Sequence, residues 1–258
     1  MRAGARGRCR ASRVLLEPAS LAAVAAVSVV AALVGGIGGF GSGAILTAAL
    51  APLIGIKALI PVMAVAGALI NAGRFWFYRR SLERRTLLLV LAWALPFLVL
   101  GTWIYSVLDT RVLGTIIGLA VIASVPLRRY LKKRAVHVGA RGLAVGSSVF
   151  GLATGITTGT GVILVSLLLG MGLGGPALLA TDSLVSIALD VAKAALFHRL
   201  SLLDQDAFLT GAVIGAASVP GSAAAAWLVM RMHAHLHILV MESLVVLGGA
   251  SVLWNSWR

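Results

Sequence analysis

Long apolar runs alternate with short polar or glycine-rich segments along almost the whole chain. A helix that crosses a bilayer needs about 20 mainly apolar residues, and eight units approach or reach that length. They cover residues 21–34 with the glycine-rich stretch that follows, 59–78, 86–108, 112–127, 144–171, 176–197, 207–230 and 236–257. This pattern predicts an all-α integral membrane protein with about eight spanning units.

Glycine interrupts two of these units. Residues 35–43 contain six glycines, and Gly151, Gly155, Gly159 and Gly161 interrupt the run that begins at residue 144. Each glycine costs about 1 kcal/mol relative to alanine inside a helix. Broken backbone inside a membrane must also be buried in protein or line a cavity. We therefore expect each half of the chain to open with a discontinuous or re-entrant helix.

Both glycine motifs belong to a longer internal repeat. Gly41-Ser42-Gly43 followed by Ala-Ile-Leu corresponds to Gly159-Thr160-Gly161 followed by Val-Ile-Leu, and Asn71-x-x-Arg74 corresponds to Asp190-x-x-Lys193. The offset between the copies stays at about 118 to 124 residues. These matches predict a basic N-terminal tail (1–17), a first membrane repeat (18–127), a basic cytoplasmic linker (128–141) and a second membrane repeat (142–258).

Composition agrees with a membrane location. Of the 258 residues, 60% are hydrophobic and only 12% are charged, whereas soluble domains carry about 25% charged residues. The net charge of +14 is concentrated in tracts beside the apolar runs, at 2–13, 79–85 and 128–141. Basic tracts in that position orient a membrane protein and favour anionic headgroups, so we expect the lipid bilayer as partner and no nucleic acid. The first apolar run shows no clear cleavage site, which predicts that it is retained.

Loop charge leaves two topologies open. With four crossings in each half, the N-terminal tail, the loops 79–85 and 128–141 and the C-terminus share one face, which predicts a multi-pass protein of the plasma membrane with both termini in the cytoplasm. Alternatively, each glycine-broken unit is a hairpin that returns to its starting side. Each half then has an odd number of full spans, and the repeats are inverted, as in many transporters.

Corresponding polar pairs lie toward the ends of two corresponding spans. Asn71 and Arg74, and likewise Asp190 and Lys193, are three residues apart and share one helix face. Cations at membrane depth usually face protein or water, so the pairs are candidates for attracting an anion. The alternatives are that Arg74 extends to the interface and that Lys193 forms a structural ion pair with Asp190. Since only Lys193 has a neighbouring carboxylate, we expect the first half to provide the net charge of the site.

The sequence gives less information about the roles of the remaining polar residues. Asp182 is either a cap of the helix that follows the glycine turn or a protonatable group used for coupling. His233, His235 and His237 have no cysteine nearby and only Glu242 as a carboxylate, so we expect no metal site and no cofactor. Cys9 is the single cysteine, which excludes an internal disulfide. No sequence motif of a protease or hydrolase is present, so we expect no enzyme.

The half-helices after the glycine motifs are the strongest candidates for an anion site. A helix N-terminus carries about half a positive charge, and its first N–H groups lack intrahelical partners. Residues 44–54 and 162–169 would each present such an end beside Gly41, Ser42 and Gly43, or Gly159, Thr160 and Gly161. The alternative is that the glycines only allow close helix packing.

Three features resemble those of the TauE/SafE sulfite exporter family. They are the glycine break 35–43, the following span that ends in Asn71-Ala-Gly-Arg74, and the repetition of this pattern after a basic loop. This resemblance covers nearly the whole chain, from residue 21 to residue 257. It implies a permease that moves sulfite or a small organosulfur anion such as a sulfonate. An anion channel and a transporter of small carboxylates are the alternative functions, and a homodimer is one possible assembly.

Overall fold

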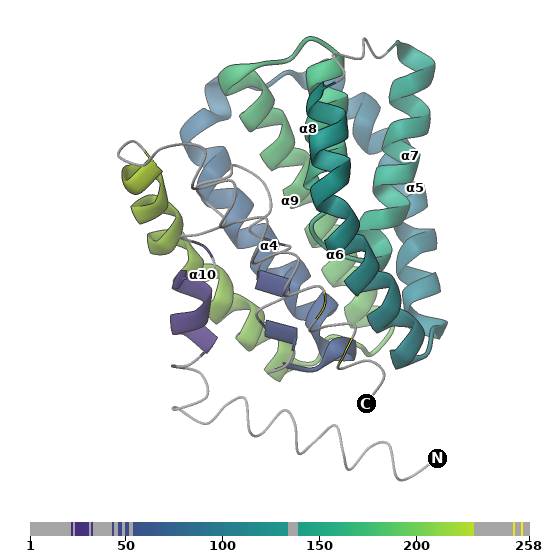
Figure 1. The fold of residues 1–258 in the computed structure, drawn as a ribbon, viewed down its shortest axis with the longest axis vertical. Coiled ribbons are helices and arrows are strands. Elements are labelled where there is room, and N and C mark those ends of the chain that lie inside the picture. The colour runs from purple at the N-terminus through teal and green to yellow at the C-terminus, as the bar shows by residue number, and fades with distance from the viewer. Residues whose placement is uncertain are drawn as a thin grey trace.

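The computed structural model describes residues 22, 24–30, 32, 43, 46–47, 50–51, 54–133, 139–229, 250 and 254. Within these ranges the chain consists of helices and short turns, with no strand, which confirms the all-α prediction. The helices are α4 (Ile56–Tyr78), η1 (Arg79–Ser81), α5 (Arg84–Val107), α6 (Thr110–Lys133), α7 (Ala140–Ile156), α8 (Gly161–Gly170), α9 (Gly175–Arg199) and α10 (Gln205–Val229). Figure 1 shows these helices side by side in one bundle.

Among the described residues, three segments are long and apolar enough to cross a membrane: Lys57–Ser81, Arg84–Val107 and Gly175–Arg199. The total of eight spanning units stays a prediction. Residues 128–133 of the expected basic linker continue α6 as helix, consistent with the good helix propensity of arginine and lysine. Several expected features lie outside the described residues: the last span apart from residues 250 and 254, the histidines near residue 235, and the Gly41 and Ser42 positions.

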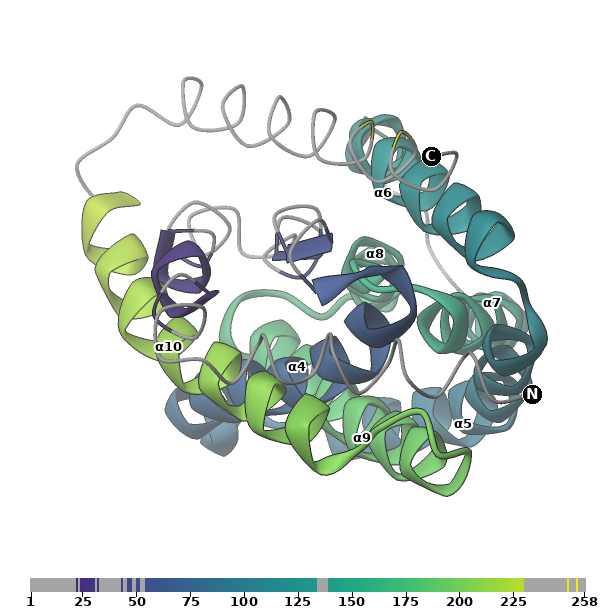
Figure 2. The ribbon, with the colours of Figure 1, turned by 90° about the horizontal axis from the view of Figure 1, so that it is seen from below.

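α7 and α8 form an antiparallel helical hairpin. Near its tip the Thr154 and Thr160 hydroxyls are 2.7 Å apart, and farther from the tip Gly146 lies against the side chain of Leu167. These two contacts show that the two helices run in opposite directions. The chain between Ile156 and Gly161 is the tip of this hairpin, and α8 lies inside the bundle with α6, α7 and α9 around it (Figure 2).

Helices α4 and α9 also run antiparallel to each other. Arg74, late in α4, contacts Asp182, early in α9, and Gly67 lies against Asp190. These helices carry the corresponding motifs Asn71-x-x-Arg74 and Asp190-x-x-Lys193 of the two repeats. Their opposite directions, together with the α7–α8 hairpin, support the inverted alternative over four crossings in each half. α4 packs against α10, and α9 packs correspondingly against α5, so the repeats interlock.

Small residues bring α5 and α7 into close contact. A Cβ atom on Gly155 would lie 2.6 Å from the Leu98 carbonyl oxygen and 2.7 Å from the Thr102 nitrogen. Such contacts are typical of helices packed in lipid, where close van der Waals contact replaces the hydrophobic driving force. On the outside of the bundle, large apolar side chains such as Trp76, Phe77 and Trp103 are more than half exposed, and this surface suits contact with lipid.

The inverted arrangement can be tested by cysteine labelling in a Cys9→Ser background. We expect Ser81→Cys and Gly139→Cys to lie on the cytoplasmic face, because the basic loops are there. Asp109→Cys and Asp204→Cys should lie on the opposite face and react with an impermeant maleimide in intact cells. Inverted membrane vesicles should give the reciprocal pattern. Parallel repeats would instead place residue 204 on the same face as residue 81.

Gly155→Ala tests the contact between α5 and α7. The added Cβ meets backbone atoms of α5 that cannot move alone, so we expect a loss of about 1–3 kcal/mol in unfolding free energy. Thermal denaturation in detergent, followed by size-exclusion chromatography, measures the change. Gly139→Ala is the matched control, because a Cβ atom at Gly139 meets nothing within 4 Å. Equal stability of the two variants would contradict this account of the packing.

Candidate functional site

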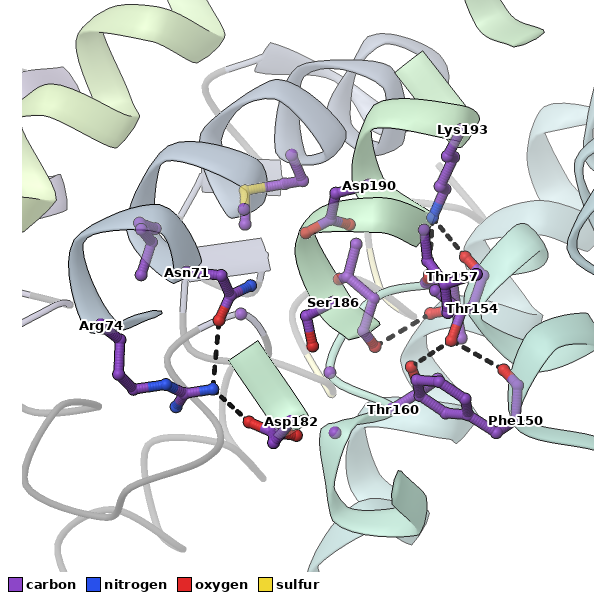
Figure 3. Close-up of a pocket in the computed structure, with 18 residues that line it drawn as sticks. Asn71, Arg74, Phe150, Thr154, Thr157, Thr160, Asp182, Ser186, Asp190 and Lys193 are labelled. Carbon is purple, nitrogen blue, oxygen red and sulfur yellow. Dashed lines mark hydrogen bonds and ion pairs between the residues drawn. The ribbon is translucent and has the colours of Figure 1, made fainter. Parts of the chain in front are cut away.

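A polar cavity of about 120 Å³ lies between α4, α9 and the tip of the α7–α8 hairpin (Figure 3). Since a water molecule in the liquid occupies about 30 Å³, this space suits a few waters or a small ion. Nine of the residues selected from the sequence line it: Gly43, Asn71, Arg74, Gly159, Thr160, Gly161, Asp182, Asp190 and Lys193. The fold thus brings together candidate residues from both repeats.

Arg74 connects the two repeats across this cavity. Its Nη2 group donates a hydrogen bond of 3.1 Å to Asn71 Oδ1 and forms an ion pair with Asp182, while Nε donates to Ser183 Oγ at 2.8 Å. The expectation that Arg74 carries uncompensated charge is therefore wrong. Its counter-charge comes from a residue 108 positions away in sequence, which the antiparallel α9 brings beside it.

Asp182 does not cap a helix. It is the eighth residue of α9, which begins at Gly175 with Gly174 as its N-cap, so the capping interpretation is wrong. The Asp182 side chain is only 4% exposed. One carboxylate oxygen, Oδ2, pairs with Arg74, whereas Oδ1 is buried and has no hydrogen-bond partner among the described residues.

Lys193 is buried at the hairpin tip, with 1% of its surface exposed. Its Nζ group donates hydrogen bonds to the carbonyl oxygens of Thr154 and, at 2.9 Å, of Thr157. The last carbonyls of α7 lack partners inside their own helix and carry partial negative charge, so a cation stabilises them. Among the described residues Lys193 makes no direct ion-pair contact with Asp190, although the two charges are close enough to attract each other, and the Asp190 carboxylate lies beside Gly67 of α4.

Threonines and glycines form the hairpin tip. Gly159 has φ of 78°, a conformation that glycine adopts without strain. Thr160 is the N-cap of α8, yet its side chain makes no capping hydrogen bond, because the hydroxyl pairs with Thr154. The beginning of α8 therefore faces the cavity through Gly159, Thr160 and Gly161 without a side-chain cap.

The first glycine motif meets the second at this tip. A Cβ atom on Gly43 would lie 3.6 Å from the backbone nitrogen of Gly159. Beside it, the Thr47 hydroxyl donates a hydrogen bond to the Gly43 carbonyl at 2.6 Å, and the Thr158 hydroxyl therefore donates to Thr47. Residues of both glycine motifs therefore lie side by side in one wall of the cavity.

A family profile described as "Sulfite exporter TauE/SafE" matches residues 24–252, which include both repeats. The chain belongs to the TauE/SafE sulfite exporter family. TauE/SafE proteins are membrane transporters and not enzymes, so this TauE/SafE chain is a multi-pass membrane transport protein. Comparisons with curated proteins and with solved structures gave no significant match.

Several hydroxyl groups of this TauE/SafE cavity were not selected from the sequence. Thr154, Thr157, Thr158 and Ser186 line it, and Ser183 binds Arg74. The four threonines between residues 154 and 160, in an otherwise apolar segment, are a signal that could have indicated the cavity wall. Ser183 and Ser186 gave no comparable signal, since serines in apolar helices commonly bond their own backbone.

Lys193→Met tests the role of this lysine at the hairpin tip. Loss of two hydrogen bonds from a charged donor, each worth about 1.5–3 kcal/mol, should raise amide hydrogen exchange around Thr157 by at least about tenfold. Mass spectrometry of the peptide that covers the tip measures this, with peptides of α5 as an internal reference. Lys57→Met, at an exposed lysine of α4, is the control. Unchanged exchange at the tip would contradict the assignment.

Proposed function

We propose that this TauE/SafE protein is a secondary transporter of a small oxyanion, sulfite or a sulfonate, and that the cavity between the repeats binds it. The observation that carries the proposal is the position of Arg74 and the uncapped start of α8 on the walls of one small cavity. Both are features that bind oxyanions in proteins, through charged hydrogen bonds and through main-chain N–H groups.

Charge in the cavity is balanced rather than positive. Arg74 and Lys193 face Asp182 and Asp190, so the formal charges of these four described side chains cancel when all are ionised. Attraction of an anion would then depend on oriented donors: the guanidinium of Arg74 and the main-chain N–H groups at the start of α8, beside Gly159–Gly161. A balanced site favours a small anion of low charge, because a highly charged one would stay without compensation.

The arrangement of the repeats favours a transporter over a passive channel. Inverted repeats that meet at a shared site allow one half to rock against the other and expose the site to either face in turn. The antiparallel contact of α4 and α9, with Arg74 and Asp182 across it, is the boundary along which the halves would move. We propose the plasma membrane as its location, with the basic loops in the cytoplasm.

Flux of ³⁵S-labelled sulfite and methanesulfonate into proteoliposomes tests the proposal. We expect saturable flux of at least one of them, reduced at least about tenfold by Arg74→Ala, because a hydrogen bond to a charged group is worth about 1.5–3 kcal/mol. Arg79→Ala is the matched control, since Arg79 lies over the ring of Trp76 outside the cavity, 3.7 Å from its centroid. Its flux should equal that of the unmodified protein.

Folding of the variant must be checked separately. Arg74→Ala leaves Asp182 buried without its counter-charge, which destabilises proteins by about 3–5 kcal/mol. Arg74→Lys keeps the charge but loses the planar donor set, so we expect a folded protein with intermediate flux. Unchanged flux in folded Arg74→Ala protein would contradict the proposed site, and flux that does not saturate would identify a channel.

A further inference from the structure

We infer that Asp182 carries a proton across the membrane together with the anion, which makes this protein an anion–proton cotransporter. This inference rests on the proposed function and adds the coupling ion to it. It comes from the geometry of Arg74 and Asp182, which lie on opposite repeats and share one small cavity.

Among the described residues, only one of the two carboxylate oxygens of Asp182 has a partner. Its side chain is 96% buried, Oδ2 pairs with Arg74, and Oδ1 has no hydrogen-bond partner in the described part of the chain. A buried carboxylate is stable in the charged form only while its counter-charge and hydrogen bonds are in place. The Arg74 guanidinium is therefore the group on which the charge of Asp182 depends.

An oxyanion in the cavity competes for that same guanidinium. Arg74 Nη2 faces both Asn71 and Asp182, so an anion bound at this end of Arg74 takes the place of the Asp182 carboxylate. Without its counter-charge, the carboxylate takes up a proton from the open side of the cavity. When the anion leaves on the other side, Asp182 releases the proton and pairs with Arg74 again. For a monoanion, each cycle moves one negative and one positive charge in the same direction.

The other charged groups around Asp182 do not provide a substitute for Arg74. On α9 itself, Lys193 is bound to the carbonyls of Thr154 and Thr157, and Asp190 lies against Gly67 of α4. The neighbouring η1 and α5 carry arginines that are exposed: Arg79, Arg80, Arg84 and Arg85. Glu83, also exposed, contacts α9 through its backbone nitrogen, which donates to Thr181. α7 and α8 line the cavity with apolar side chains, hydroxyls and backbone.

Two transport measurements on the same proteoliposomes separate the proton from the anion. The first is counterflow, the exchange of ³⁵S-sulfite against unlabelled sulfite at equal pH, which needs only anion translocation. The second is accumulation of ³⁵S-sulfite driven by an imposed pH gradient. We expect Asp182→Asn to keep saturable counterflow, at a lower half-saturating sulfite concentration because the competing carboxylate charge is gone, and to lose the response to the gradient. Because sulfite itself binds a proton near neutral pH, the variant and the unmodified protein are compared at identical pH values.

Asp109→Asn is the matched control, since it makes the same chemical change at an exposed residue between α5 and α6; its response to the gradient should be unchanged. Counterflow without any response to the gradient in the unmodified protein would overturn the inference and leave the proposed function intact. Loss of counterflow in folded Asp182→Asn protein would also overturn it, as would loss of the gradient response in Asp190→Asn alone. Absence of sulfite and methanesulfonate flux in the unmodified protein would remove the proposed function and this inference together.

Discussion

Main-chain groups that are freed where a helix breaks inside a membrane must find partners within the protein, because lipid provides none. The break between α7 and α8 is where this constraint acts in the described part of the chain. Lys193 binds two carbonyls at the end of α7, and the hydroxyls of Thr154 and Thr160 pair with each other next to the start of α8. Because Lys193 lies on α9, these hydrogen bonds to the end of α7 form only when α9 passes beside the hairpin tip. The position of α9 then determines which of its side chains line the rest of the cavity.

Passage of α9 beside the tip also places it along α4. The antiparallel contact of these two helices brings Asp182 to Arg74 and leaves room for Asp190 only where α4 has a glycine, at Gly67. Every charge in the cavity then has a partner or a neighbour from the opposite repeat or from the hairpin tip. These charged side chains therefore stabilise the contact between the two repeats as well as line the cavity. An anion that binds in the cavity must break at least one of these contacts.

Close packing of small residues provides the rigid frame for these polar contacts. Gly151 and Gly155 of α7 lie directly against the backbone of α5, and Gly211 and Gly215 of α10 lie directly against α4. In lipid, such contacts replace the hydrophobic effect as the reason for helices to associate. A cavity in the middle of this frame stays small, and the backbone and short hydroxyl side chains of the hairpin tip form one of its walls.

The sequence by itself determined the class of the protein and the position of the break between α7 and α8, and it selected most of the charged residues that line the cavity. These are local properties: apolar run length, the helix-breaking effect of glycine, and the spacing of Asn71 with Arg74 and of Asp190 with Lys193. It did not determine which charges pair: the expectation of an uncompensated Arg74 and the capping interpretation of Asp182 were wrong. The loop charges favoured four crossings in each half over inverted repeats, without excluding the inverted arrangement. Only the tertiary structure decided these points, because the direction of a helix and the contact between residues 108 positions apart depend on how the whole chain packs.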